Sequence, residues 1–339
     1  MLVTRSKPAV ALPAVALAVG NFDGVHIGHQ AILARVRAEA QARGLSPALL
    51  TFEPHPRELF TPEAAPTRLS TLREKLQLLS EAGIERVHVQ RFSRAFAALT
   101  PQQFVQQLLL QSLRVRWLMV GEDFRFGAGR AGDVALLESL GREHGFVVER
   151  MPAVLAPLQG STAAASAAAG AAASPSPSPS AAAAAQRVSS SAVRAALAAG
   201  DLPQARRLLG RDYVVSGRVV HGDKLGRELG FATANVQMKH NRPPLAGIYA
   251  VRMLGVPGGD ARAGWPGVAS LGVRPTVKTN GHPVLEVHLF DFKGNLYDLH
   301  VKVQFLHKIR DEAKYPDLAA LTAQIARDCE QARAWLASH

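Results

Sequence analysis

A short apolar run, Val15–Val19, leads into the turn Gly20–Gln30 (GNFDGVHIGHQ), after which apolar residues recur at helical spacing. This pattern predicts a buried strand, a turn and a helix that stops near Gly44. Glycines in the turn let its backbone approach a ligand closely, and the unpaired N–H groups of a helix start attract anions. His26 and His29 fall three residues apart, on one face of that helix start. The stretch therefore predicts a phosphate site in which two imidazoles donate hydrogen bonds.

Two other interpretations of these histidines stay open at this point. They could ligate a metal ion, although no third ligand stands at a recognisable spacing from His26 and His29. They could also be surface histidines, because so short a pair arises readily by chance. The preceding strand and the following helix favour phosphate, and they leave the substrate open.

The first 150 residues alternate strand-like and helix-like segments, which predicts an α/β domain with a Rossmann-like parallel sheet covered by helices. A capping box of Thr71 and Glu74 predicts a helix whose apolar side carries Leu72, Leu76 and Leu79. Further strands are expected at residues 48–52, 87–89, 115–120 and 146–148.

Three turns of this domain directly follow predicted strands: Gly20–Gln30, Glu53–Pro56 and Gly121–Gly127. The prolines of Glu53–Pro56 are expected to end a strand and to hinder the start of a helix at that place. Ligands of parallel sheets bind beyond the carboxyl ends of the strands. We therefore expect the three turns to share one cleft.

The hydrophobic period changes from 3.6 to 2 in the last third of the chain. Short strands are expected at residues 213–215, 218–220, 248–251, 285–289 and 301–305, with a turn at Lys293–Asn295. Short strands with glycine-rich turns predict an antiparallel β-barrel. An apolar stripe, including Cys329, then predicts a terminal helix.

A low-complexity stretch separates the two patterns. Residues 151–186 carry no charged side chain and contain a Ser-Pro repeat, so they cannot bury enough apolar surface to order themselves. We expect a flexible loop over residues 156–186. Two domains are predicted: residues 1–209, which contain the parallel sheet, and residues 210–339, which contain the barrel.

Charge and cysteine content narrow the class of protein. The formal net charge is +12, from 39 basic and 27 acidic residues, without a dense basic cluster, so we expect no nucleic-acid partner. A single cysteine fits a reducing compartment. The apolar run before Gly20 is interrupted by prolines and is too short to span a bilayer. We expect a cytoplasmic protein without a membrane partner.

A serine-rich turn follows the low-complexity stretch. Ser189, Ser190 and Ser191 can offer hydroxyl and N–H groups to a phosphate, and Arg194 adds a fixed positive charge. Taken alone, the serines favour an ordinary helix cap.

Four motifs together resemble the bacterial bifunctional riboflavin kinase/FMN adenylyltransferase (FAD synthetase) family. Gly20–Gln30 is similar to the family's G-N-F-D-G-V-H-x-G-H, and Thr51–Glu58 to its T-F-x-P-H-P-x-E. Gly121–Gly127 is similar to its G-x-D-F-R-F-G. Ser189–Arg194 is similar to its S-S-T-x-I-R, with Ser191 where threonine is usual.

The resemblance implies that the phosphate of FMN attacks the α-phosphorus of ATP, giving FAD and pyrophosphate. In this interpretation His26 and His29 stabilise charge on the α-phosphate, and the Ser189–Arg194 turn holds the pyrophosphate. The remaining nucleotide or flavin contacts that the resemblance implies are Asn21, Asp23, Gly28 and Asp123.

For the barrel, only the resemblance indicates a kinase, because the chain has no G-x-x-x-x-G-K-[ST] loop. Gly217–Asn235 (GRVVHGDKLGRELGFATAN) resembles the flavokinase G-x-V-x-H-G-D-x-x-G-R-x-L-G-F-P-T-A-N. Leu285–Phe292 resembles its E-x-h-x-x-D-F strand, and Ile309–Glu312 its R-x-E-x-K-[FY] segment. Three departures are Ala232 for proline, Ser270 for asparagine and Asp298 for glycine.

The flavokinase resemblance also implies roles. Thr233 and Asn235 would bind Mg²⁺ with the phosphates of ATP, Gly222 and Arg310 would contact ATP or flavin, and Glu286 would be the general base on the ribityl 5′-hydroxyl. A glutamate projecting into the barrel could act as this base. The pattern alone also allows an outward, solvated glutamate between core valines.

Three functions follow from these observations. The favoured one is an enzyme with both activities, which uses ATP to make FMN from riboflavin and then FAD from FMN. The second is an adenylyltransferase whose barrel binds flavin but phosphorylates it poorly. The third is a synthetase-like RNA-binding protein, suggested by H-I-G-H and the positive charge but lacking K-M-S-K-S and a basic, aromatic platform.

Overall fold

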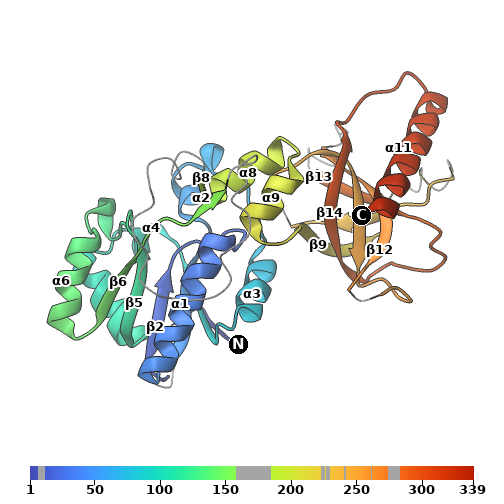
Figure 1. Ribbon diagram of the computed structural model, residues 1–339. Helices are drawn as coiled ribbons and strands as arrows, with labels where there is room; N and C mark the ends of the chain where they lie inside the picture. The colour runs from blue at the N-terminus through green and yellow to red at the C-terminus, as the bar shows by residue number, and fades with distance from the viewer. Residues whose placement is uncertain are drawn as a thin grey trace. The chain divides into compact units, whose positions relative to one another are not determined.

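The computed structural model describes residues 1–6, 12–157, 185–222, 226, 230–239, 242–260, 262–273 and 283–339. The chain forms two compact units (Figure 1). The first comprises Met1–Pro66 and Lys75–Ser189, and the second Thr67–Glu74 and Ser190–His339. Most of the predicted flexible loop, residues 158–184, lies outside the described residues.

The first unit alternates strands and helices as predicted. Its elements are β1 (Leu2–Thr4), β2 (Val15–Val19), α1 (Ile27–Arg43), β3 (Ser46–Glu53), α2 (Pro56–Phe60), η1 (Pro62–Ala64), α3 (Leu72–Glu81, which begins in the second unit), β4 (Arg86–Arg91), α4 (Arg94–Ala97), α5 (Pro101–Gln103), η2 (Phe104–Ser112), β5 (Val115–Gly121), η3 (Ala128–Arg130), α6 (Val134–His144), β6 (Val147–Met151), β7 (Leu155–Pro157) and β8 (Ala185–Arg187).

Six of these strands form one parallel sheet in the order β1-β4-β3-β2-β5-β6. Alternate residues of β2 face opposite ways: Leu17 joins the core under η2 and α6, and α1 packs against β2 and β3 (Figure 1). All five residues of β2 are buried. A strand buried on both faces is typical of a parallel sheet with helices on each side, which confirms the predicted fold of this unit.

Most helix ends lie where the local sequence signals predict them. Gly44 ends α1 in the left-handed conformation at φ +62°, and Thr71 and Glu74 bond each other's backbone N–H as a capping box does. At Glu53–Pro56 the strand ends as predicted, but the expected hindrance to a helix is wrong, because α2 begins at Pro56 with His55 as its N-cap. Proline suits this first helical position, since its missing N–H would have no partner there anyway.

Two other predictions need correction. The ends of the predicted loop form strands, since β7 and β8 pair as antiparallel neighbours with Ala156 opposite Gln186. Backbone bonds can order such a ladder with little apolar burial. On α3, Lys75 and Leu79 are the buried residues, whereas Leu72 and Leu76 are only partly buried.

The second unit is the predicted antiparallel barrel with a terminal helix. Its elements are α8 (Ser190–Ala198), α9 (Leu202–Leu209), β9 (Tyr213–Val220), β10 (Ala234–Gln237), β11 (Gly247–Leu254), β12 (Trp265–Val273), β13 (Pro283–Leu289), β14 (His300–Arg310) and α11 (Leu318–Ser338). The barrel closes in the order β10-β13-β12-β11-β14-β9. The two short strands predicted over 213–220 are one strand, because Gly217 continues the ladder opposite Val301.

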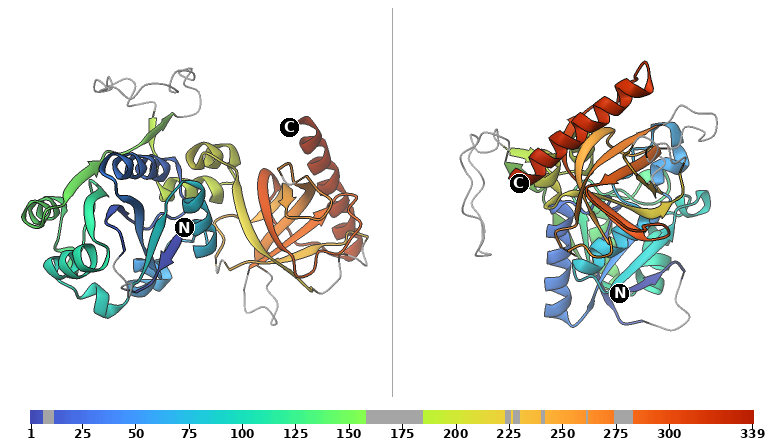
Figure 2. Two further views of the ribbon diagram at one scale, coloured as in Figure 1. Left: turned by 90° about the horizontal axis from the view of Figure 1, so that it is seen from below. Right: turned by 90° about the vertical axis from the view of Figure 1, so that its right-hand side faces the viewer.

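The barrel has a filled interior and a partly covered exterior. Val236, Leu285 and Leu271 occupy one register row of three neighbouring strands and are almost fully buried, so this row faces inward. On the outside, α11 lies against the barrel (Figure 2) and buries Cys329 against residues such as Val268. Burial raises the pKa of the Cys329 thiol to about 11, as expected for a packing residue.

A bidentate ion pair ties α11 to β14. Arg310 donates to both carboxylate oxygens of Asp328 at 2.9 and 2.7 Å, and the Asp328 side chain is 4% exposed. We expect Asp328→Ala to lower the free energy of unfolding of this unit by about 3 kcal/mol, because it leaves the guanidinium partly buried without its partner. Urea unfolding measures this change.

The matched control is a second bidentate pair to α11, between Arg333 and Asp291, whose side chains are 48% and 78% exposed. Water screens this pair, so Asp291→Asn is expected to lower the free energy of unfolding much less than Asp328→Ala does. Equal losses in the two variants would contradict the importance of burial for the Arg310 pair.

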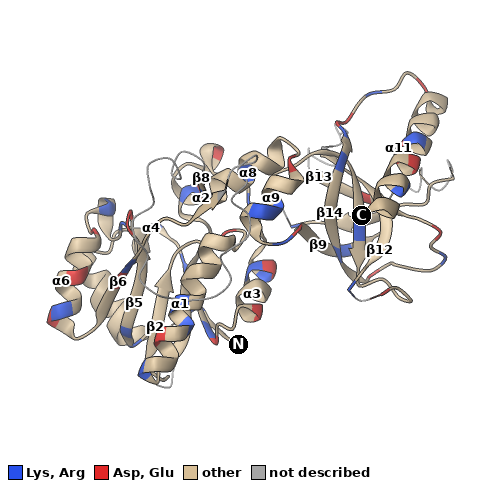
Figure 3. Cartoon of the chain, in the orientation of Figure 1, with Lys and Arg blue, Asp and Glu red and all other residues tan. Residues whose placement is uncertain are grey.

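Charged positions of both signs intermingle along α1, α6 and α11 (Figure 3). Arg35 and Glu39 pair on α1, and Glu138 of α6 pairs with Arg150. Within the described part of the chain, none of the helices combines the length and the apolar character that a bilayer crossing requires.

Candidate active sites

The turn between β2 and α1 places both predicted histidines at the start of α1. His26 is the N-cap residue, and its Nδ1 accepts the backbone N–H of His29 at 3.3 Å. The cap therefore requires that Nδ1 of His26 carry no proton. In a neutral imidazole the proton then sits on Nε2, which leaves that N–H as a donor at the positive end of the helix.

The two imidazoles stack on each other, with ring centroids 3.7 Å apart and planes 14° apart. The Phe22 ring also lies against His29, at 4.6 Å between centroids. Burial lowers the pKa of His29 well below 6.5, and the charges of His26 and Lys75 lower it further. Neutral His29 is therefore the dominant form near pH 7.

Two buried polar atoms of this turn have no hydrogen-bond partner among the described residues: Nδ1 of His29 and Oδ1 of Asn21. Buried polar atoms of native proteins almost always have partners. Both atoms belong to residues for which the family resemblance implies contact with the substrates. Asp23 lies in the same turn and is 3% exposed.

Gly20 and Gly28 are needed for the packing of side chains within the turn. A Cβ on Gly28 would press on the His26 ring, at 3.2 Å from Nδ1, and one on Gly20 would lie 3.0 Å from the Phe22 ring. Phe22 and Val25 adopt positive φ values of 48° and 40°. For a β-branched residue such as Val25 this conformation is strained, as is frequent at functional sites.

A cavity of about 870 Å³ opens beside this turn. It is lined by all three turns predicted to share a cleft, including Asn21, His55, Arg57, Asp123 and Arg125, which confirms their convergence. His26 and His29 are not among the lining residues.

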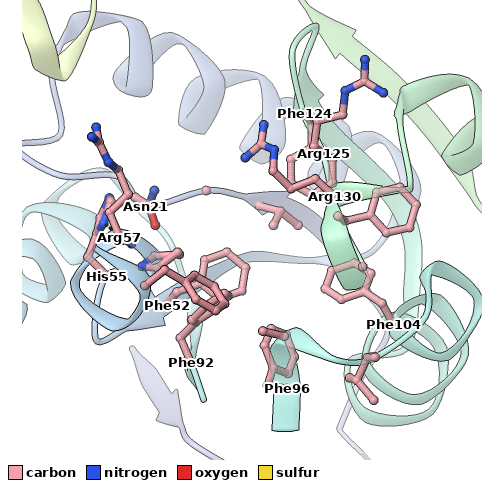
Figure 4. Close-up of a pocket in the computed structure, with 18 of the residues that line it drawn as sticks. Asn21, Phe52, His55, Arg57, Phe92, Phe96, Phe104, Phe124, Arg125 and Arg130 are labelled. Atoms are coloured by element: carbon pink, nitrogen blue, oxygen red, sulfur yellow. Dashed lines mark hydrogen bonds between the residues drawn. The ribbon is translucent and has the colours of Figure 1, made fainter. Parts of the chain in front are cut away.

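Most of the cavity wall lies outside the sequence motifs. Phenylalanine rings form one side, and Arg57, Arg125 and Arg130 reach in from elsewhere on the rim (Figure 4). The rings of Phe92 and Phe96 lie 5.6 Å apart, edge to face. Phe92 directly follows β4 and Phe96 lies in α4, so a fourth strand end contributes to the site. The Phe-x-x-x-Phe spacing after that strand was the available signal.

The other residues predicted for adenylyl transfer lie elsewhere in the fold. Asp123 is exposed on the cavity rim, with Arg187 at 3.6 Å. Ser190, Ser191 and Arg194 open α8, which belongs by its contacts to the second unit, whereas Ser189 ends the first. Arg194 donates to the Thr67 carbonyl oxygen at 2.6 Å.

In the barrel, one register row brings predicted kinase residues together. Asn235 of β10 stands opposite Glu286 of β13, and Glu286 stands opposite Ser270 of β12. Their sequence neighbours Leu285 and Val287 are fully buried, so Glu286 lies on the outer face and not inside the barrel. The idea of an inward glutamate is wrong, because the pleat gives the interior to its apolar neighbours. Glu286 is half-buried there.

Two glycines adjoin this row. A Cβ on Gly222 would overlap the side-chain amide of Asn235, and one on Gly226 would lie 3.2 Å from the Thr233 hydroxyl oxygen. Gly222, Thr233 and Asn235 thus lie in one neighbourhood, with Glu286 beside Asn235. Several other residues of the motif, 223–225 and 227–229, lie outside the described residues.

The three departures from the flavokinase pattern all lie near this site or its strands. Ser270 stands beside Glu286 in the register row. The carbonyl oxygen of Ala232 accepts a bond from His288 Nδ1 at 2.9 Å, which holds the turn before Thr233 without a proline. Asp298 adopts φ +66°, the left-handed region in which glycine is favoured.

Arg310, predicted to contact ATP or flavin, binds Asp328 through two nitrogens and donates to the Asp311 carbonyl oxygen with the third. Its guanidinium also lies 5.7 Å from the centre of the Tyr315 ring. These contacts give Arg310 a structural role in joining β14 to α11.

Comparison with known proteins assigns each part of the chain to a family. Residues 10–162 match the FAD synthetase family, and residues 209–336 match the riboflavin kinase family. A bifunctional riboflavin kinase/FMN adenylyltransferase of Escherichia coli K12 is 45% identical, with 92% of this chain and 90% of the relative covered. The protein of that description from Haemophilus influenzae is 41% identical, with 96% of each chain covered.

A solved structure described as a macrolide-efflux protein from Streptococcus pneumoniae has a TM-score of 0.74, with 98% of this chain and 99% of that chain covered. At 24% identity it supports the fold alone. The two family matches and the full-length relatives establish more. This chain belongs to the bifunctional riboflavin kinase/FMN adenylyltransferase family, and it acts on riboflavin, FMN and ATP to form FAD.

Proposed function

We propose that adenylyl transfer takes place at the start of α1, where His26 and His29 act as hydrogen-bond donors to the α-phosphate of ATP. The observation that supports this most is the stacked, capped imidazole pair beside two buried polar atoms without partners. An oxygen of the FMN phosphate attacks the α-phosphorus, and the bond from that phosphorus to the pyrophosphate oxygen breaks. Neutral donors suffice, because no proton has to leave either imidazole in this step.

The aromatic cavity is the proposed site of the flavin ring. Its volume of about 870 Å³ falls within the range of small-molecule sites. Faces and edges of Phe52, Phe92 and Phe96 suit a flat aromatic ligand. Arg57 and Arg125 on the rim suit the phosphate of FMN, since a guanidinium pairs readily with phosphate oxygens.

The remaining adenylyl-transfer residues keep the roles that the family resemblance implies. Gly28 leaves room for the His26 ring. Asn21, Asp23 and Asp123 are proposed contacts to nucleotide or flavin. Ser189, Ser190, Ser191 and Arg194 are proposed to hold the pyrophosphate; the hydroxyls near the start of α8 support this. We retain residues 1–209 and 210–339 as the functional domains.

For the barrel we propose that Glu286 is the general base that takes the proton of the riboflavin 5′-hydroxyl. Its half-buried place between Asn235 and Ser270 supports this role, since a carboxylate acts as a base only where the hydroxyl can reach it. The hydroxyl oxygen then attacks the γ-phosphorus of ATP, and ADP leaves.

A magnesium ion fits the neighbourhood of Thr233 and Asn235. Mg²⁺ prefers hard oxygen ligands and usually takes few of them from protein, with phosphate oxygens and waters completing its shell. Thr233 and Asn235 supply two such oxygens, and the space that a Cβ on Gly222 would need is occupied by the Asn235 amide. When bound, the ion neutralises charge on the phosphates. Gly222, which has no side chain, leaves room for the nucleotide to approach the backbone. Arg310 supports β14, the strand on which it lies.

Small molecules are the proposed partners, with no role for nucleic acid or membrane, in a cytoplasmic setting. The intermingled charges of Figure 3 support this for nucleic acid, because such binders concentrate basic side chains on one face.

A time course with riboflavin, ATP and MgCl₂ tests the proposal. FMN is expected to form first and FAD later, and chelation of the metal is expected to stop FMN formation because Thr233 and Asn235 carry no charge of their own to help hold ATP. Chromatography separates the flavins. FMN formation that continues in excess chelator would contradict the metal site, and the absence of both products would contradict the two-step scheme.

A further inference from the structure

Lys75 is a charged residue in the buried face of α3. Its side chain is 1% exposed, and Leu79, one turn later, is fully buried on the same face. Lysine is almost never fully buried unless its ammonium group has polar or charged neighbours. An ammonium at this place therefore calls for a role that an apolar residue could not fill.

Lys75 contacts the Thr51 hydroxyl, which lies beneath the adenylyl-transfer turn. Its Nζ donates to Thr51 Oγ1 at 3.5 Å, and that hydroxyl donates to the carbonyl oxygen of Asn21 at 3.1 Å. Thr51 is fully buried on β3. The hydrogen bonds lead from the Lys75 ammonium, through the Thr51 hydroxyl, to the Asn21 peptide in the turn that carries both histidines.

The charge of Lys75 also reaches the histidine pair. The titratable groups that act on the pKa of His29 are His26, stacked against it from the turn, and Lys75 from α3, and both lower it. Asp23 is the buried acid of the same turn. A positive charge at this point favours the uncharged imidazole.

We propose that Lys75 is a positioning residue of the adenylyl-transfer site, whose buried ammonium holds the Asn21 peptide through Thr51 and keeps the two imidazoles in their stacked arrangement. This inference rests on the proposed roles of His26 and His29. Lys75 acts through the turn, so it touches neither the nucleotide nor the flavin in this arrangement.

The test is Lys75→Met, which keeps the length of the side chain and removes its charge. FAD formation from FMN is expected to fall by about 10²-fold, because small displacements of reacting groups cost that much, while riboflavin phosphorylation keeps its rate. In ¹⁵N-histidine-labelled protein, the NMR titration of His29 is expected to move to higher pH. A residue needed only for folding would not move that titration.

Leu79→Ala is the matched control on the same helix face. It removes buried packing without a charge, so it is expected to lower stability and to leave the His29 titration and the FAD rate of the folded protein unchanged. If Lys75→Met does not fold, Thr51→Val tests the link instead, and it is expected to lower the FAD rate by at least about 10-fold.

Three outcomes separate the possibilities. An unchanged FAD rate and His29 titration in Lys75→Met would overturn the inference, and so would an unchanged rate in Thr51→Val. A full FAD rate in His29→Ala would overturn the proposed function of the histidine. In that case a shifted titration in Lys75→Met would still establish the electrostatic link.

Discussion

His26→Asn is expected to lower the rate of FAD formation from FMN by about 10²–10³-fold, the usual loss when one donor to a developing charge is removed. Asparagine is a strong N-cap residue, so its Oδ1 can accept the His29 N–H in place of His26 Nδ1. The start of α1 is then kept, and only the Nε2–H donor is lost. The rate is measured with FMN and ATP, without riboflavin.

Two further variants serve as comparisons for His26→Asn. His26→Ala loses both the donor and the cap, and is expected to cost about 1 kcal/mol in unfolding free energy in addition. His88→Gln changes a buried histidine of β4 that bonds Thr4 and Gln90, and is expected to leave the FAD rate of the folded protein unchanged. A His26→Asn enzyme with normal FAD formation would contradict the donor role.

The strand–turn–helix pattern around Gly20–Gln30 predicted the first unit well, because local signals there agree with the final packing. Gly44 stops α1 and three turns after strands line one cavity. Where local and tertiary preferences compete, the prediction was wrong. Leu72, Leu76 and Leu79 were expected on the apolar side of α3, and of these three only Leu79 is buried, together with Lys75.

The cavity wall lay beyond sequence reasoning for a related reason. Phe92 and Phe96 are far in sequence from the motifs, and they join the site only because β4 pairs with β3. A motif search finds residues that resemble a pattern, whereas parallel pairing brings every strand end to the same edge. The face of Glu286 could be read from its neighbours, since Leu285 and Val287 are the more apolar of the alternating set.

Glu286→Gln is expected to lower riboflavin phosphorylation by about 10²–10⁴-fold, the range for removal of a general base. Glutamine has nearly the same shape and can still form hydrogen bonds beside Asn235 and Ser270, but its amide cannot take a proton from the 5′-hydroxyl. Adenylyl transfer to supplied FMN is expected to keep its rate, because His26 and His29 belong to the other unit.

Two substrates separate the steps in this variant. Riboflavin with ATP should give little FMN or FAD, whereas FMN with ATP should give FAD at the unmodified rate. Glu330→Gln, which changes an exposed carboxylate of α11, is the control and should phosphorylate riboflavin normally. If Glu286→Gln retained its kinase rate, the hydroxyl proton would leave by another route, and the outer-face row would bind substrate without supplying the base.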